Sequence, residues 1–314
     1  MNKIKGAFDQ VQYLEISEDQ QGQRIDNFLL SRLKGVPKSR IYRLLRKGEV
    51  RVNKGRIRPD YRLSAADVVR LPPVRVSAVK KVAPGQGLRN KLANSILLET
   101  KNFLVIDKPS GLAVHGGSGI NLGVIESLRA MRGEHDYLEL AHRLDRDTSG
   151  CLLIAKSRRA LKHLQNQMRQ RSMDKRYITL VSGRWDKGRR EVNAPLLKQT
   201  LASGERVVRS HTDGKYALTH FTLLKHYQKA SLLDVVLETG RTHQIRVHCQ
   251  LVGHPLAGDS KYGSESFNAF LQTQGMRRLF LHAAELAFTD PESDERVRVK
   301  APLPSELEDL LRCL

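Results

Sequence analysis

Cysteine is scarce in this 314-residue sequence: Cys151, Cys249 and Cys313 lie far apart, and no two have zinc-site or redox spacing. Two of them fall in apolar runs, so we interpret them as small buried side chains and expect a reducing compartment. No run approaches the ~18 apolar residues that a membrane-spanning helix needs, and residues 1–10 contain no apolar signal core. These absences predict a cytoplasmic location, and we expect a monomer by default.

Acidic residues are also few relative to basic ones. The chain has 54 Lys and Arg against 33 Asp and Glu, a net charge of +21, and its pI is near 10.1. The excess is concentrated, because residues 22–62 contain 13 Lys or Arg against 3 Asp or Glu. A merely soluble basic protein would spread its charge more evenly, so the pattern favours a polyanionic partner.

The first part of the chain has the pattern of a small domain. Residues 1–13 lack an apolar period and are expected to form a loose tail. After them, apolar residues at helical and then at strand spacing predict two helices, a hairpin and a closing strand, at residues 22–33, 39–48, 50–58 and 67–72. Gly48 is expected to cap the second helix at its C-terminus. We therefore predict a small α/β domain over residues 14–75.

Residues 76–92 are polar, interrupted by proline and glycine, and show no apolar period, so we interpret them as a linker. The second domain, residues 93–314, is dominated by strand patterns, which lie at residues 95–99, 102–107, 111–115, 151–156, 175–181, 231–238 and 297–301. Helical patterns lie between some of them, such as residues 158–169 after a capping Ser157. The fold class predicted for this domain is α+β, built around a mostly antiparallel mixed sheet.

The segment HRLDRDTSG, residues 142–150, differs from the other charged stretches. It gathers a His, two Arg and two Asp directly before the apolar run 151–156, so a buried strand should hold this loop rigidly. Catalytic groups often occupy rigid loops at the rim of a sheet, but a structural cluster of ion pairs has the same charge pattern. The residues alone leave both interpretations open.

Two other features predict less. The glycine-rich HGGSG at 115–119 lacks the Lys-Ser/Thr of a phosphate-binding loop, and we interpret it as a turn. Five histidines of the second domain lack metal-ligand spacing, at positions 142, 243, 248, 254 and 282. No metal site is predicted.

The N-terminal domain resembles the S-four-type RNA-binding domain in the stretches GQRIDNFL, SRIYRLLRKGEVRVN and DVVRLP. The resemblance implies that Arg40, Arg43, Arg46 and Lys47 contact phosphates of structured RNA. Such contacts anchor RNA without reading its sequence. The alternative is a solvated charged face of a helix.

The later part of the chain is similar to the RluA-type pseudouridine synthases. HRLDRDTSG matches the signature of that family, and further matches occur in the family's chain order: DKPSGLAVH at 107–115, KRYITLVSG at 175–183, TGRTHQIRVH at 239–248, GDSKYG at 258–263 and LHA at 281–283. With its N-terminal domain, the whole chain resembles the C-type members, which act on large-subunit (23S) ribosomal RNA.

The resemblance implies a pseudouridine synthase fold, uridines of ribosomal RNA as the substrate, and Asp145 as the catalytic carboxylate. The reaction breaks the bond from N1 of uracil to C1′ of ribose, turns the base and rejoins it through C5. Because no atoms are gained, no cofactor is required. Attack on C1′, addition to C6 and removal of a sugar proton are all open to the carboxylate, and the sequence does not choose among them.

A free aspartate is already ionised at pH 7, so the difficulty is to keep its charge inside a dry pocket. Helical spacing from a Thr242 cap to a Gly253 stop places Arg246 on a polar stripe. The resemblance places Arg246 against Asp145, where a guanidinium at about 4 Å contributes roughly 4 kcal/mol at an effective dielectric of about 20. The alternative for Arg246 is an ordinary surface arginine.

The resemblance assigns two further roles at the site. Tyr177 is implied to stack on the target base and to take part in transfer of the C5 proton, although a phenol pKa near 10 makes it a poor base. The alternative is a core tyrosine. Arg143 is implied to help displace the uridine from its helix, which offsets part of the unstacking cost. We also expect RNA contacts from Arg241, His243 and Gln244. In the loop itself, the structural interpretation is favoured for Arg146, Asp147 and His142.

A function of another class stays open, that of a non-catalytic RNA-binding factor in ribosome assembly. The basic N-terminal domain alone would suffice for it. A binder has no use for a buried carboxylate that repels phosphate, so the loop at 142–150 favours the enzyme. A nuclease or methyltransferase lacks support, because the sequence shows no cofactor loop and no metal constellation.

Overall fold

The computed structural model describes residues 10–33, 35–74, 83–116, 122–133, 137–188, 190–200 and 205–314. Contacts within the chain divide it into two compact units, residues 1–81 and residues 82–314. None of the helices in the described ranges is long and apolar enough to cross a membrane.

The N-terminal unit packs two helices against a small antiparallel sheet. The helices are α1 (Ile25–Arg32) and α2 (Lys38–Arg46), and a single 3-10 turn lies at Glu18–Gln20. The sheet has the order β1-β4-β2-β3, with β1 Gln12–Glu15, β2 Arg51–Val52, β3 Gly55–Arg56 and β4 Val68–Leu71. The predicted helices, hairpin and closing strand are confirmed. So is the cap, because Gly48 has a φ of +67°, which glycine adopts without strain.

The predicted tail needs a correction within this unit. Gln12 and Tyr13 belong to β1, which pairs with β4 over its whole length. The strand is only four residues long, and its alternation of half-buried and exposed side chains is too short for a period to be recognised. Residues 1–9 lie outside the described residues.

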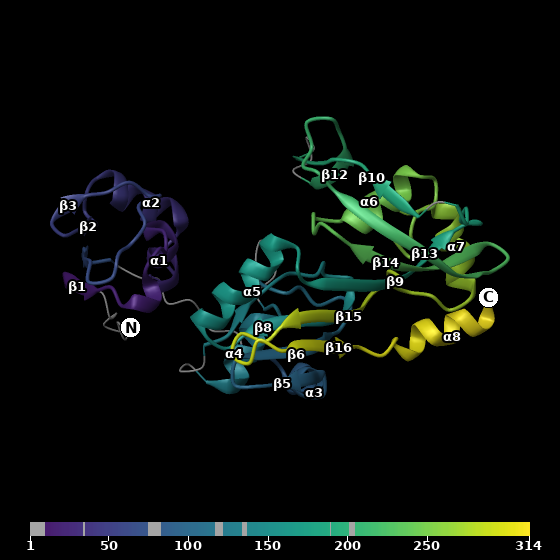
Figure 1. Ribbon diagram of the computed structural model, residues 1–314, viewed down its shortest axis with the longest axis horizontal. Coiled ribbons are helices and arrows are strands. Elements are labelled where there is room, and N and C mark those ends of the chain that lie inside the picture. Colours follow the sequence, from purple (N-terminus) through teal and green to yellow (C-terminus); the bar gives the residue numbers. More distant parts are fainter. Residues whose placement is uncertain are drawn as a thin grey trace, which may run out of the picture. The chain divides into compact units, whose positions relative to one another are not determined.

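The second unit is built on a ten-stranded sheet (Figure 1). Eight strands follow the order β10-β13-β14-β9-β15-β8-β6-β5, while β16 pairs with β15 and β7 pairs with β8. All pairs are antiparallel except β8 with β15, so the predicted mixed, mostly antiparallel sheet is confirmed. The strands are β5 Ile96–Glu99, β6 Phe103–Lys108, β7 Glu139–Leu140, β8 Ser149–Ala155, β9 Asp174–Ser182, β10 Glu191–Asn193, β13 Leu218–His226, β14 Ala230–Leu237, β15 Leu281–Thr289 and β16 Arg296–Lys300.

In the described part of this unit, a separate two-stranded ribbon and six helices accompany the sheet. The ribbon pairs β11 (Leu196–Thr200) with β12 (Arg206–Ser210). The helices are α3 Gln86–Ala93, α4 Val124–Arg132, α5 Arg158–Gln170, α6 Gln244–Leu251, α7 Glu265–Thr273 and α8 Ser305–Cys313. Ser157 caps α5 as predicted, since its hydroxyl accepts a hydrogen bond from the N–H of Ala160.

Two sequence interpretations of this unit were wrong. The end of the expected linker is helical, because α3 buries Leu92 and packs Leu88 against the core of the second unit. The expected strand at 111–115 is a turn and irregular chain, in which the carbonyl oxygens of Ala113 and Val114 accept hydrogen bonds from the N–H groups of Val124 and Ile125 at the start of α4. The turn expected at 115–119 falls partly outside the described residues, and the part of the expected linker before residue 83 lies wholly outside them.

Strand β8 lies in the middle of the sheet, and all seven of its residues are buried. Its side chains alternate between two apolar clusters, one packed with α4 and the other with α5, which explains its continuous apolar sequence. At its start, Gly150 has a φ of +107°, and a Cβ there would lie 2.3 Å from the carbonyl oxygen of Ala283. Only glycine fits, and the close approach to β15 fixes the loop that enters β8.

Candidate active site

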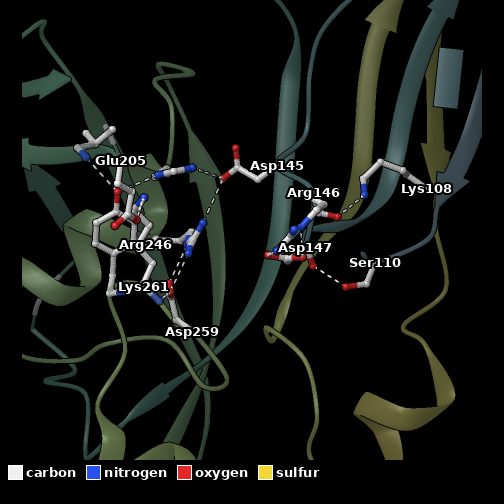
Figure 2. Close-up of polar contacts among 12 residues, drawn as sticks. Lys108, Ser110, Asp145, Arg146, Asp147, Glu205, Arg246, Asp259 and Lys261 are labelled. Atoms are coloured by element: carbon white, nitrogen blue, oxygen red, sulfur yellow. Dashed lines mark hydrogen bonds and ion pairs between the residues drawn. The ribbon is translucent and has the colours of Figure 1, made fainter. Parts of the chain in front are cut away.

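The loop at residues 142–148 is held from the end of β6. Lys108 is fully buried, and its Nζ donates hydrogen bonds of 2.8–2.9 Å to the carbonyl oxygens of Pro109, Leu112 and Arg146. Burial lowers the pKa of Lys108 to about 7. The three carbonyl oxygens nevertheless match the three N–H groups of the ammonium form and therefore favour it. Ser110 adds a 2.7 Å hydrogen bond to the carbonyl oxygen of Asp147 (Figure 2). The sequence reasoning did not identify Lys108, although it lies in the quoted stretch DKPSGLAVH.

The other polar residues of the loop have the structural roles that were predicted for them. Arg146 and Asp147 form an ion pair with a 3.0 Å contact, but the loop is fixed mainly through their carbonyl oxygens. His142 accepts a 3.0 Å hydrogen bond at Nε2 from the N–H of Leu153. Burial lowers the pKa of His142 to about 4, so it is a neutral packed histidine at neutral pH.

Asp145 projects from this loop toward α6. Its Oδ2 lies 3.8 Å from Nη1 of Arg246 and 3.8 Å from Nε2 of His243, and its side chain is 19% exposed. The predicted proximity of Arg246 to Asp145 is therefore confirmed. At these distances neither contact is a hydrogen bond, and a guanidinium beside a carboxylate of low exposure chiefly stabilises its negative charge.

Arg246 is itself held by a second carboxylate. Its Nε and Nη2 each donate a 2.7 Å hydrogen bond to Asp259, whose side chain is fully buried (Figure 2). Asp259 also accepts hydrogen bonds of 2.9 Å from the backbone N–H groups of Lys261 and Tyr262. Burial alone would raise the pKa of Asp259, but Arg246 and these N–H groups outweigh it and lower the pKa. This leaves Nη1 of Arg246 to face Asp145.

The sequence does not single out Asp259, because its partner Arg246 lies in another segment. The matching stretch GDSKYG was recognised, but nothing in its local pattern shows that the carboxylate pairs with Arg246. The same stretch supplies Tyr262, whose ring lies 4.9 Å from the guanidinium carbon of Arg246. Arg246 therefore meets carboxylates at two of its edges and an aromatic ring on one face.

His243 immediately precedes α6 and occupies its N-cap position, one residue after the predicted Thr242. It has a φ of +54°, a left-handed conformation that is uncommon outside glycine. Its Nδ1 lies 2.8 Å from the hydroxyl of Tyr262, which accepts a hydrogen bond from the N–H of Val208. Because burial lowers the pKa of His243, Tyr262 can donate its proton to Nδ1. The ring proton then lies on Nε2, toward Asp145.

A cavity of about 90 Å³ lies beside Asp145 and is lined by Tyr177 of β9, among others. Tyr177 is 7% exposed, and burial, reinforced by Asp145, raises the pKa of its phenol. It is therefore less suited to act as a base than a free tyrosine. Arg143 is exposed and lines the same cavity, as does Arg241, whose Nε donates a 3.0 Å hydrogen bond to the carbonyl oxygen of Tyr216.

The expectation for Gln244 needs a correction. Its side chain is 2% exposed, and its amide oxygen accepts hydrogen bonds from the hydroxyl of Thr239 and the N–H of Arg241. Its amide nitrogen donates to the carbonyl oxygen of Leu218 and to Thr219. With all these groups engaged inside the protein, Gln244 fixes the loop before α6 and does not offer a contact to RNA.

In the N-terminal unit, the predicted phosphate contacts lie on the outer side of α2 and just after it. Arg43, Arg46 and Lys47 are exposed, and Arg40 is half-buried. Within the described ranges none of the four forms an ion pair with a carboxylate. Their charges are therefore available to a ligand.

The described residues contain no group of three His, Cys, Asp or Glu side chains placed to hold a metal ion. Cys151 and Cys249 are buried, as predicted, and burial raises the pKa of Cys151 to about 12.

Known proteins share both units of this chain. Residues 102–251 match the RNA pseudouridylate synthase family, and residues 23–69 match the S4 domain. The chain is 53% identical over 307 residues to "Ribosomal large subunit pseudouridine synthase C" of Pasteurella multocida, and the aligned residues cover 97% of this chain and 94% of the relative. A protein of the same name from Escherichia coli K12 is 53% identical over 315 residues, or 99% and 98% of the two chains.

A solved structure agrees with this assignment. Human RNA Pseudouridylate Synthase Domain Containing 4 superposes with a TM-score of 0.59 and 26% identity, over 72% of this chain and 95% of that one. Human RNA Pseudouridylate Synthase Domain Containing 1 gives a TM-score of 0.58 at 27% identity, over 72% of this chain and 89% of that one. The fold, the loop around Asp145 and the similarity along almost the whole chain agree, and this chain belongs to the RNA pseudouridylate synthase family.

Proposed function

We propose that this protein isomerises uridines of large-subunit ribosomal RNA to pseudouridine, with Asp145 as the catalytic carboxylate. The observation that carries the proposal is the pairing of Asp145 with the buried Arg246 at 3.8 Å, beside a cavity that Tyr177 also lines. The names of the relatives support ribosomal RNA as the substrate, and the S4 domain supports RNA as the ligand. A cytoplasmic location and a monomeric state stay predictions.

The proposed chemistry needs an ionised carboxylate next to the sugar and the base of the target. Arg246 stabilises the charge of Asp145, and Asp259 keeps the guanidinium in its orientation. His243 offers its Nε2 proton from a second direction. Attack on C1′, addition to C6 and removal of a sugar proton all begin with this ionised group, so the same arrangement serves each route.

The aromatic ring of Tyr177 has the second role in the proposal, as the surface on which uracil stacks. Its raised pKa argues against a phenolate that removes the C5 proton. The proposal therefore keeps the stacking role that the resemblance implies for Tyr177 and leaves out the role of a phenolate base.

Basic side chains provide the RNA contacts. Arg143 is exposed beside Asp145, and we assign to it the displacement of the target uridine, where its side chain takes the place of the extruded base. Arg241 and His243 border the same cavity. The four cations of α2 and its C-terminus, which carry no carboxylate partner in the described part of the chain, are assigned to phosphate anchoring.

Substitution of Asp145 by Asn tests the catalytic role. The amide has almost the same size but cannot ionise, so we expect the variant to release no tritium from C5-labelled uridine in ribosomal RNA while it still binds that RNA. Asp147→Asn is the matched control, because it removes the neighbouring carboxylate of the same loop, which pairs with Arg146. Normal turnover by Asp145→Asn would refute the proposal.

The non-catalytic alternative is tested by mapping pseudouridines in ribosomal RNA from cells with and without this gene. The proposal predicts that one or more pseudouridines disappear in the absence of the gene and return with the wild-type chain, but not with Asp145→Asn. An unchanged map would favour an assembly factor. The arrangement around Asp145 favours the enzyme, because a simple binder has no use for a carboxylate that repels phosphate, yet here Arg246 and Asp259 hold one in place beside the cavity.

A further inference from the structure

An open cleft of about 660 Å³ adjoins the cavity at Asp145. One wall is the loop at 142–148, and another is the ribbon of β11 and β12, which contributes Val207 and Arg209. The ribbon is tied to the stretch after Asp259, since the hydroxyl of Tyr262 accepts a hydrogen bond from the N–H of Val208. The cleft therefore has a fixed second wall, whose residues have no role in the catalysis described above.

The charges that line this cleft are unequal in number. Its carboxylates are each paired within the protein: Asp145 with Arg246, Asp147 with Arg146, and Glu205 with Lys261 (Figure 2). Two arginines that line the cleft are left over, Arg143 on the loop and Arg209 on β12. Neither guanidinium has an ion pair or hydrogen bond in the described part of the chain, and both side chains are exposed.

Strand alternation explains why Arg209 faces the cleft. Val207 and Arg209 are two residues apart and line the cleft together, while Val208 between them is buried against α6. Lys198 of β11 lies opposite Val208 in the register, so it belongs to the other face of the ribbon, and it does not line the cleft. Arg209 is therefore directed to the site of chemistry, and Lys198 is not.

We propose that Arg209, across the cleft from Arg143, forms a phosphate-binding subsite, which holds the backbone of the RNA strand next to the extruded uridine. The planar fork of an arginine matches the oxygens of a phosphodiester, and no carboxylate among the described residues pairs with Arg209, so its fork is open to such a ligand. The inference rests on the proposed function, because it takes RNA as the ligand. It adds to that function a residue, Arg209, that positions the strand without touching the reacting atoms.

The test uses the full chain and a transcript of large-subunit ribosomal RNA. Arg209→Ala should weaken binding about fivefold and leave kcat at saturating RNA unchanged. The slope of log affinity against log salt concentration should fall by about 0.7 to 0.9, the value for one lost phosphate contact. Lys198→Ala removes a charge from the opposite face of the same ribbon and should change neither quantity. Arg209→Lys should restore the slope but not the full affinity.

The outcomes separate this inference from the function on which it rests. If the wild-type chain forms no pseudouridine in the transcript, the proposed function fails. If it does, but Arg209→Ala binds with the wild-type affinity and slope, the subsite alone is overturned. Equal losses of affinity in Arg209→Ala and Lys198→Ala would overturn it as well, because the losses would then reflect the net charge of the ribbon and not a specific phosphate contact of Arg209.

Discussion

Two short helices of this chain carry arginine in opposite ways. On α2, Arg43 and Arg46 are exposed and have no carboxylate partner among the described residues. On α6, Arg246 is 6% exposed and lies between two carboxylates, at 2.7 Å from Asp259 and 3.8 Å from Asp145. The residue type is the same, but its surroundings direct it toward a ligand in one unit and toward the protein in the other.

The difference predicts two kinds of mutational effect. An exposed guanidinium that binds phosphate contributes a modest, salt-dependent share of affinity, which adds to that of its neighbours. A buried guanidinium that orients a catalytic carboxylate acts on the chemical step, where a small misplacement is costly. Removal of an arginine side chain on α2 should therefore weaken RNA binding, whereas a substitution around α6 should lower kcat.

Among the residues that surround Asp145, the largest effect is expected from Asp259→Asn. The variant keeps the size of the side chain but loses the charge that orients Arg246, so kcat should fall about 100-fold while KM stays within a few-fold. Single-turnover kinetics with ribosomal RNA would measure both. A wild-type kcat in this variant would contradict the contrast between α2 and α6, because Arg246 would then not depend on Asp259 for its orientation.

A matched control is available in the same sheet. Asp234 is 5% exposed and pairs with Arg176 between β14 and β9, but it does not line the cavity. Asp234→Asn should lower the melting temperature without a comparable fall in kcat. Equal falls in kcat for the two variants would mean that loss of a buried ion pair, and not the orientation of Arg246, causes the effect.

A smaller effect is expected on α2. Replacing Arg40, Arg43 and Arg46 together with Ala should weaken RNA binding, and it should lower the slope of log affinity against log salt by about 2 to 3, at about 0.7 to 0.9 per contact. The value of kcat at saturating RNA should not change. Arg312→Ala on α8 removes an exposed arginine that already pairs with Asp309, and it should leave the slope unchanged. If the slope of log affinity against log salt is unaltered in the triple variant, these arginines do not anchor RNA phosphates.

The smallest effect concerns a basic group that the fold keeps uncharged. His282 is fully buried beside β8, bonded to Ser149 and to the carbonyl oxygen of Ala301, and burial lowers its pKa to about 4 from an ordinary 6.5. Between those values the unfolded chain binds a proton that the folded chain refuses, so the folded state loses stability as pH falls from 6.5 to 4.

His282→Asn removes this titration. The variant should melt at a lower temperature than wild type at pH 7, and the difference should narrow toward pH 4. Thermal unfolding followed by circular dichroism at several pH values would measure it. Parallel curves for the two proteins would show that His282 does not contribute to acid sensitivity.

The sequence predicted best what depends on local pattern or on a recognisable stretch. The apolar periods predicted α1, α2, α5 and the buried strands, and the family resemblance predicted that Arg246 lies beside Asp145. Asp259 and Lys108 were not singled out, because their roles arise from contacts with α6 and with the loop at 142–148 that no spacing reveals. Gln244 was misjudged for a related reason, since a polar side chain in a motif gives no sign that the fold will bury it.

The division of the chain into two compact units has a consequence for avidity. Once the N-terminal unit holds an RNA, the cavity at Asp145 meets that RNA as part of the same complex, at an effective concentration set by the connecting chain and not by bulk RNA. Modest contacts on each unit then multiply. A fragment too short to occupy both units should lose that advantage and bind far more weakly than the sum of its remaining contacts suggests.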